Sequence, residues 1–142
     1  MKHEHSKYCH CLYYSVNALA RVLTKMAEEE FAVTGLAPSY AFLLMTVNEQ
    51  PGIQPTEISA HMQLTPSTVT RLIEKMEHKG LLKRQSEGKY TYVYPTEKSK
   101  KRNKKIHEAW ANLYRRYSDL LGEAKGRALT DQVYAASIKL EK

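Results

Sequence analysis

The sequence predicts a mainly helical domain with one small β-hairpin, an α+β fold, on three observations. Apolar residues recur at helical spacing over most of the 142 residues. Prolines and glycines divide these periodic segments at short intervals. Residues 81–94 instead contain β-favouring residues that alternate with a period of two around a Gly-containing turn.

The first two predicted helices lie within residues 8–48. The first covers residues 8 to about 32, and its apolar residues follow one another at spacings of four, three, four and three, which keeps one face apolar. Gly35 is its expected stop. Pro38 begins the second helix, which runs to about Asn48. The apolar face of the first helix consists of Leu12, Val16, Leu19, Leu23 and Met26.

Two further helices are separated by a tight turn. Residues 55–62 form a short helix. Thr65 can cap the next helix with its hydroxyl, and Pro66 suits the first helical position because its missing N–H would be unpaired there anyway. Gly80 ends that helix, since glycine tolerates a left-handed C-terminal conformation. The inward face consists of Val69, Leu72, Ile73 and Met76.

A β-hairpin follows this helix pair. Its predicted strands are Leu81–Gln85 and Tyr90–Tyr94, joined by the four residues Ser86–Lys89. In the second strand Tyr90, Tyr92 and Tyr94 alternate with Thr91 and Val93. Two helices across a tight turn, followed by such a hairpin, make a winged helix-turn-helix.

Two helices complete the predicted fold. A long one runs from about Thr96 to Leu121, the segment Gly122–Gly126 breaks it, and a last helix covers roughly Ala128–Leu140. We therefore expect residues 1–142 to form a single domain, with residues 38–95 as the winged helix-turn-helix. Residues 8–34 and 96–142 exceed what a winged helix needs, and pairing with a second copy is their simplest role.

The positive charge is concentrated in one stretch. The chain carries a net charge of +7, and residues 79–105 contain ten Lys or Arg against two Asp or Glu. A local excess of this kind is typical of a polyanion-binding surface. A solvated, lysine-rich helix face would give the same charge pattern, so the neighbouring motif has to decide between them.

The composition argues against several classes of protein. No apolar run approaches the ~18–20 residues of a membrane helix, and no secretory signal precedes the first helix. Two cysteines cannot make a disulfide framework, so we expect a cytoplasmic protein. No catalytic Ser/His/Asp set, carboxylate pair or phosphate-binding glycine loop is evident. We therefore expect neither an enzyme nor a cofactor.

The helix after Thr65 has the features of a DNA recognition helix. It buries one face and leaves small polar and cationic groups on the other, where Arg71 is the best candidate for a bidentate contact to guanine. Lys89 at the hairpin tip can lie along a minor groove. The DNA-binding candidates are Thr56, Ser67, Thr68, Thr70, Arg71, Lys75, Arg84 and Lys89. Cations that open the long helix would add phosphate contacts, a minority of them touching DNA: Lys98, Lys100, Lys101, Arg102, Lys104 and Lys105.

Two other interpretations remain open. An amphipathic surface helix with Ser/Thr caps has the same local pattern, and only the hairpin and basic stretch downstream favour DNA. The rival function is a winged-helix protein-interaction module without sequence-specific DNA binding, in which Tyr90, Tyr92 and Tyr94 form a docking surface. A wing packed on its own domain is the simpler account of these tyrosines.

Residues 64–84, LTPSTVTRLIEKMEHKGLLKR, resemble the recognition-helix-to-wing segment of MarR-family transcription regulators, and the order of elements matches from Leu12 to about Leu140. The resemblance implies a homodimer that reads a pseudo-palindromic operator in double-stranded DNA and usually represses. A small molecule, metal or oxidant would release it. The family's wing usually carries an Asp-x-Arg-Asp-x-Arg run, whereas this chain has Glu87-Gly88-Lys89, so we expect a shorter, lysine-tipped wing.

The N-terminal segment is rich in cysteine and histidine. Thiolate and imidazole are ligands that zinc and copper prefer, so His3, His5, Cys9 and Cys11 are metal-ligand candidates. Residues 9–13 also resemble the Cys-x-x-Leu-Tyr opening of the organic-peroxide-sensing MarR branch, which implies a redox-sensing cysteine, with Cys9 and Cys11 as the candidates. Three interpretations stay open: a thiol switch at Cys9, a metal site, or ordinary cysteines.

The family resemblance also implies a possible small-molecule effector. Such ligands often sit between the dimerisation and DNA-binding parts. In this chain that region would be lined by residues of the first and second helices such as Tyr14 and Phe42.

Overall fold

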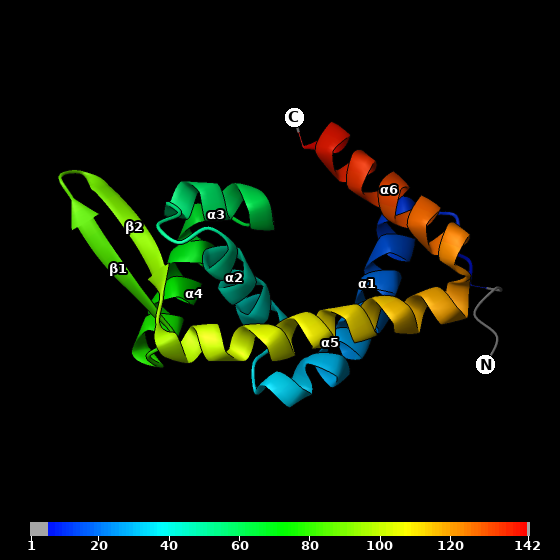
Figure 1. The fold of residues 1–142 in the computed structure, drawn as a ribbon. Helices are drawn as coiled ribbons and strands as arrows, with labels where there is room; N and C mark the ends of the chain where they lie inside the picture. The colour runs from blue at the N-terminus through cyan, green and yellow to red at the C-terminus, as the bar shows by residue number, and fades with distance from the viewer. Residues whose placement is uncertain (1–5, 142) are drawn as a thin grey trace.

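The computed structural model describes residues 6–141 and confirms a mainly helical fold with a two-stranded antiparallel hairpin. Figure 1 shows α5 running the length of the molecule, from the β-hairpin at one end to the start of α1 and α6 at the other. The elements in chain order are α1 (Leu12–Phe31), the 3₁₀ turn η1 (Ala32–Thr34), α2 (Pro38–Glu49), α3 (Pro55–Met62), α4 (Pro66–His78), β1 (Leu82–Glu87), β2 (Tyr90–Pro95), α5 (Glu97–Leu121) and α6 (Glu123–Leu140).

The hydrophobic core surrounds α2. This helix has little amphipathic character because α1, α3, α4, α5 and β2 all pack against it. Its buried residues are Ala41, Leu43, Leu44, Met45 and Val47. Other elements contribute Phe31, Ile58, Val69, Ile73, Met76, Leu82, Val93 and Ile106 to the same cluster. One continuous core therefore holds α2, the α3–α4 pair, the hairpin and the first half of α5.

The predicted start of α4 is confirmed. Thr65 is extended (φ −70°, ψ 152°), its hydroxyl accepts from the backbone N–H of Thr68 at 3.4 Å, and Pro66 is the first helical residue. The turn before it closes through Gln63 in the left-handed region (φ 54°). At the start of α3, Gln54 and Glu57 form a capping box, which was not predicted.

The hairpin turn is shorter than predicted. Glu87 pairs with Tyr90, so the turn is the two residues Gly88-Lys89 rather than the four residues 86–89. Gly88 has φ 62° and Lys89 is not in the positive-φ region, which is the pattern of a type II′ turn with glycine at its first central position. A turn of this type matches the twist of the strands and lets pairing continue to the tip.

A backbone bridge joins the hairpin to the helical core. The N–H of Gly52 donates to the Val93 carbonyl at 2.8 Å, and the N–H of Val93 donates to the Ile53 carbonyl at 2.9 Å. A Cβ on Gly52 (φ 88°) would lie 3.3 Å from the Tyr94 hydroxyl, so glycine allows both the backbone angle and the approach of this ring. The base of the wing is thereby fixed to the α2–α3 connection.

Two helix boundaries differ from the prediction. Residues 7–10 form turns and Cys11 is extended, so α1 begins at Leu12 rather than residue 8. The break after α5 is Gly122 alone (φ 90°), and α6 begins at Glu123 rather than Ala128. Gly126 lies inside α6 and is buried next to the Leu121 side chain. Among the described residues, no single helix is long and apolar enough to cross a membrane.

Candidate nucleic-acid interface

Helix α4 separates a buried face from a polar one, as predicted. Val69, Ile73 and Met76 are buried and Leu72 is half-buried. Thr68 is also half-buried, at the edge of the outward face. Other outward residues of this helix are exposed, among them Ser67, Thr70, Arg71 and Lys75. The helix therefore presents small hydroxyls near its N-terminus and cations farther along, which are the groups that contact phosphates and base edges.

A hydroxyl chain orders the N-terminal turn of α4. The Thr65 and Thr68 hydroxyls lie 2.9 Å apart, and Nη2 of Arg71 donates to the Thr68 hydroxyl at 3.5 Å. This contact directs the guanidinium of Arg71 toward the helix N-terminus and leaves most of its five N–H donors free for another acceptor. The helix dipole adds positive potential at the same end. Thr56 is exposed in the first turn of α3.

The wing tip carries one exposed cation. Lys89 occupies the second position of the turn, with its Nζ 5.8 Å from the centroid of the Tyr90 ring. This contact holds the lysine stem along the ribbon and leaves the ammonium in solvent.

Arg84 has a different setting from the other DNA-binding candidates. Its Nη2 lies 2.8 Å from Oε1 of Glu77 and 4.0 Å from Oε2 of Glu74, and the Arg84 backbone N–H also donates to Glu77. The strand register explains this, because Arg84 pairs with the buried Val93 and shares the hairpin face that packs on the body. The ion pair of Arg84 with Glu77 therefore helps to fix β1 to α4.

The three tyrosines of β2 differ in how far they are buried. Tyr94 packs on Gly52 and is half-buried, as is Tyr92, whereas Tyr90 is exposed. The inner two rings thus pack on their own domain, and only the outer one is available as a docking surface.

The cations that open α5 lie at the base of the wing. Six-residue strands place the base roughly 20 Å from the tip. Several of these cations also bond within the protein: Lys98 donates to the Lys79 carbonyl at 3.1 Å, Lys100 pairs with Glu97, and Arg102 donates to the Thr34 carbonyl at 3.3 Å. The basic stretch therefore divides into a tip cation and a separate basal group.

The cysteine candidates lie before α1 rather than on it. Cys9 and Cys11 are free and exposed, and the Ser15 hydroxyl donates to the Cys9 carbonyl at 3.1 Å. His3 and His5 lie outside the described residues. Within residues 6–141, no group of three or more His, Cys, Asp or Glu side chains is placed to hold a metal ion.

The expected effector region is not formed within one chain. Tyr14 accepts a hydrogen bond from Ser6 and contacts the Tyr8 ring near the start of α1. Phe42 instead packs against Phe31 and Trp110. Because α1 has 20 residues, the two regions lie at opposite ends of a helix of about 30 Å.

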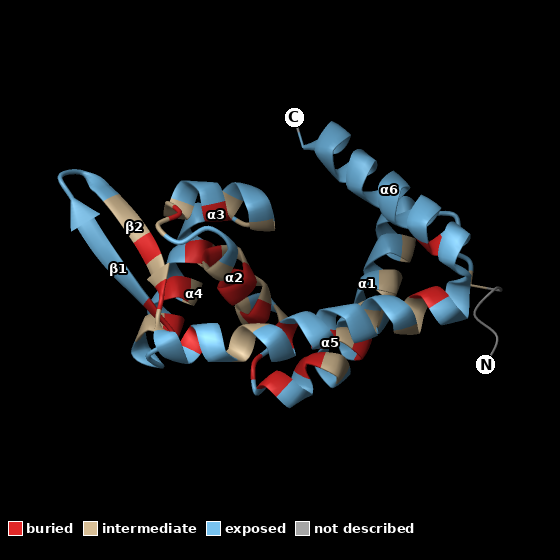
Figure 2. Ribbon diagram, in the orientation of Figure 1, coloured by how far each residue is buried: buried red, intermediate tan, exposed pale blue. Residues whose placement is uncertain are grey.

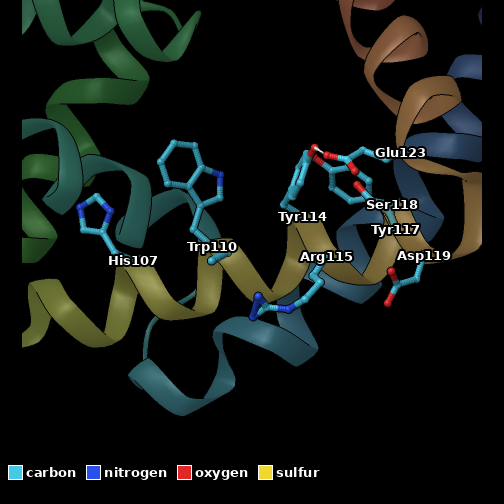
Figure 3. Close-up of a pocket in the computed structure, with 9 residues that line it drawn as sticks. His107, Trp110, Tyr114, Arg115, Tyr117, Ser118, Asp119 and Glu123 are labelled. Atoms are coloured by element: carbon cyan, nitrogen blue, oxygen red, sulfur yellow. Dashed lines mark hydrogen bonds between the residues drawn. The ribbon is translucent and has the colours of Figure 1, made fainter.

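A cavity of about 830 Å³ runs along α5. Figure 3 shows Tyr114, Tyr117, Ser118 and Glu123 gathered at one end of it, with Trp110 and His107 toward the other. Arg127 donates to the Tyr114 hydroxyl and to Glu123, each at 3.2 Å, and its hydrogen bond to Tyr114 raises the pKa of Arg127. Burial, followed by the neighbouring Tyr114, raises the pKa of Tyr117. This network ties the end of α5 to α6.

Apolar side chains are exposed where α1, α5 and α6 meet. A second cavity of about 510 Å³ lies between these helices and is lined mainly by apolar groups, with Leu19 and Leu23 from α1 and Val133 from α6 among them. The exposed large hydrophobics of these helices, some of which line the cavity, include Leu12, Tyr13, Val16, Leu120, Leu121, Leu129, Tyr134, Ile138 and Leu140. So many exposed apolar groups on adjacent helices are typical of an interface with another protein surface.

The comparisons with known proteins agree with this architecture. Residues 36–87, from just before α2 to the end of β1, match the family model of the MarR family. YybA of Bacillus subtilis (strain 168), an uncharacterised HTH-type transcriptional regulator, is 27% identical over 89 residues, which are 61% of this chain and 59% of that protein. The match therefore spans less than two thirds of that relative.

Solved structures share the fold over nearly the whole chain. A transcriptional repressor, CouR, bound to a 23-mer DNA duplex has a TM-score of 0.83 at 18% identity, covering 93% of this chain and 96% of that one. CouR from Rhodococcus jostii RHA1 bound to p-coumaroyl-CoA has a TM-score of 0.77 at 18% identity, with 94% and 95% covered. A MarR protein of Peptoclostridium difficile has a TM-score of 0.79 at 19% identity, with 99% and 93% covered. Residues 36–87 are therefore similar to the MarR family through the recognition helix and the first strand of the wing, and the solved structures share the fold over nearly the whole chain.

Proposed function

We propose that the chain is a sequence-specific, double-stranded DNA-binding transcription regulator that acts as a homodimeric repressor. The observation that carries this proposal is the outward face of α4, where Ser67, Thr70 and Arg71 are exposed beside a wing that ends in Lys89. The DNA-bound structure of CouR, which shares the fold, supports it. We further infer that the protein works in the cytoplasm, without catalysis and without a cofactor.

Each candidate side chain has a proposed role. Ser67, Thr68 and Thr70 contact phosphates or base edges at the N-terminal end of α4, because their hydroxyls are small enough to approach the groove floor. Arg71 forms the bidentate contact to guanine. Thr56 donates its hydroxyl to a phosphate, and Lys75 and the wing-tip Lys89 neutralise phosphates, the latter beside the minor groove. Arg84 acts indirectly, by fixing the wing to α4 through Glu77.

The homodimer is proposed from the exposed apolar side chains of α1 and α6. Two copies that cover these surfaces with each other would place their α4 helices on the same side of the dimer. For two major-groove contacts on one face of B-DNA, the recognition helices must lie about 34–36 Å apart. The operator would then be a pseudo-palindrome with half-sites one helical turn apart.

The trigger for release is an oxidant, a metal or a small organic ligand. The exposed thiols of Cys9 and Cys11 are accessible to oxidants and to metals. The p-coumaroyl-CoA complex of CouR supports a ligand-based alternative, since CouR shares this fold. The cavity along α5, of about 830 Å³, is large enough for such an effector.

The test is DNA binding to a pool of genomic fragments by the full-length protein. The protein is measured fully reduced, then with peroxide and then with zinc, with Cys9→Ser as the control. Selective binding that peroxide abolishes, and thiol restores, in the wild type but not in the variant supports a redox-switched repressor. A zinc-dependent change supports a metal site, and selective binding indifferent to both supports an organic effector. Absence of selective binding, or affinity insensitive to salt, contradicts the DNA-binding proposal.

A further inference from the structure

A cavity of about 550 Å³ lies on the basal side of the molecule, where η1, the end of α4 and the start of α5 meet. Figure 1 shows η1 and the start of α5 at the side of the body away from the hairpin tip. Three cations line the cavity: Lys79, Lys98 and Arg102. Its apolar lining includes Leu36 and Leu81, and no carboxylate lines it.

Backbone acceptors hold two of these cations in place. The Nζ of Lys98 donates to the Lys79 carbonyl at 3.1 Å, and Nη1 of Arg102 donates to the Thr34 carbonyl at 3.3 Å. Gly35, in the left-handed region at φ 73°, reverses the chain directly after Thr34 and leaves room beside Arg102, whose Nη1 lies 3.9 Å from the position of a Cβ. The turn at Thr34 and Gly35 thus forms part of the cavity wall and positions Arg102, while Lys98 is held by the Lys79 carbonyl.

The positive charge of this cavity is not neutralised from within the described chain. Among residues 6–141, the ion pairs of this basic stretch join Lys100 to Glu97 and Arg84 to α4, and none includes Lys79, Lys98 or Arg102. Like charges around one hollow repel one another, so an anion placed among them lowers the free energy. Arg102 keeps further N–H donors on a planar fork, and Lys98 keeps further ammonium hydrogens.

We propose that this cavity binds the phosphoryl group of a small phosphomonoester. The tetrahedral, doubly charged phosphoryl group offers three acceptor oxygens to three cations, Lys79 directly after α4 and two on α5. The apolar lining receives the organic part of the ligand, and about 550 Å³ is within the range of small-molecule sites. The site is separate from the recognition face of α4 and from the α5–α6 cavity, and it does not depend on the protein binding DNA.

The experiment is calorimetric titration of the full-length protein with inorganic phosphate and with n-butyl phosphate, without DNA and at ionic strength held constant with sodium chloride. Lys98→Gln and Arg102→Gln each remove one charge and keep a hydrogen-bond donor. Each is expected to weaken binding about tenfold, as loss of a charge-assisted hydrogen bond does. Lys101→Gln, an exposed neighbour on α5 that does not line the cavity, is expected to bind as the wild type does. Thermal unfolding without phosphate shows whether each variant is folded. If Arg102→Gln does not fold, Lys98→Gln still tests the proposal, because Lys98 is exposed.

Several outcomes would overturn the proposal. If chloride displaces the bound phosphate, or if Lys101→Gln weakens phosphate binding as much as the cavity variants do, the phosphate binds only to a diffuse basic surface. Equal affinity for inorganic phosphate and n-butyl phosphate would contradict the role of the apolar lining. Titration with a random-sequence duplex tests whether the cavity binds phosphates of the DNA backbone instead of a small phosphomonoester. If the two cavity variants weaken duplex binding and the small phosphates do not bind, the cavity is part of the DNA surface and the proposal is wrong.

Discussion

The body of the molecule and its helical arms bury apolar surface very differently. The body, from Phe31 to Ala109, contains the whole continuous core. The arms are the first part of α1, the second half of α5 and α6; in Figure 2, α6 is coloured as exposed along almost its whole length. Gly126 is the single buried residue of α6, although Tyr134 and Ile138 on that helix are large hydrophobics.

This difference indicates which parts of the fold are self-sufficient. Helix packing rather than helical propensity supplies most of the stability of a helix in water. The body obtains that packing within one chain, whereas α6 obtains little of it. We therefore expect the body to resist unfolding by itself, and the arms to depend on a second copy, so that their order depends on protein concentration.

The largest effect is expected from a cavity in the body. Leu44 is fully buried in α2, and Leu44→Ala is expected to lower the free energy of unfolding by about 2–5 kcal/mol. Urea denaturation followed by circular dichroism measures this change. The midpoint should fall by the same amount at all protein concentrations if the body folds independently. A loss that disappears at high concentration would mean that the dimer, and not the body core, holds α2.

The next largest effect is expected in the arms. Val133→Asp places a carboxylate at the apolar cavity between α1 and α6, and burying it against a second copy is expected to weaken dimerisation by at least about 2 kcal/mol. Analytical ultracentrifugation over a range of concentrations measures this. Gln132→Asp, one residue away and outside the cavity lining, controls for the effect of aspartate on the helix. Equal dimer affinity in both variants would exclude this face of α6 from the interface.

The helices of the body were largely predictable because their signals are local. Pro38, Pro55 and Pro66 begin helices at the predicted residues, since a missing N–H at the first position depends only on the proline itself. The start of α6 was missed for a related reason. Gly122 and Gly126 are equivalent in the sequence, and only their packing shows that the first interrupts the helix and the second lies within it.

The site was less predictable where it depends on contacts between elements. The exposed face of α4 follows from its 3.6-residue period, so Arg71 and Lys75 were placed correctly on the surface. The pairing of Arg84 with Glu77 depends on strand register, and a shift of one residue would have turned Arg84 to the other face. The basal cavity is assembled from α4, η1 and α5, and no local motif indicates that Lys79 and Arg102 share it.

A smaller effect, confined to DNA binding, is expected at the recognition helix. Arg71→Ala should lower operator affinity by about 1–3 kcal/mol and relax base preference at one position per half-site. Because Arg71 is exposed, dimerisation and the unfolding midpoint should not change. Binding measured against a set of single-base operator variants tests this. If affinity falls equally on every sequence, Arg71 contacts only phosphate.

The smallest effect is expected at the wing tip, far from both the core and the arms. Lys89 is exposed on a two-residue turn, and the type II′ geometry depends on Gly88, so Lys89→Ala should leave the hairpin, the dimer and the preferred site unchanged. Loss of one phosphate contact should reduce the slope of log affinity against log salt by about one unit. Lys101→Ala, a cation of the same charge at the base of the wing, is the matched control and should change the slope less. A slope that Lys89→Ala leaves unchanged would mean that the wing of this chain does not reach the DNA, and that the body reads its operator through α3 and α4 alone.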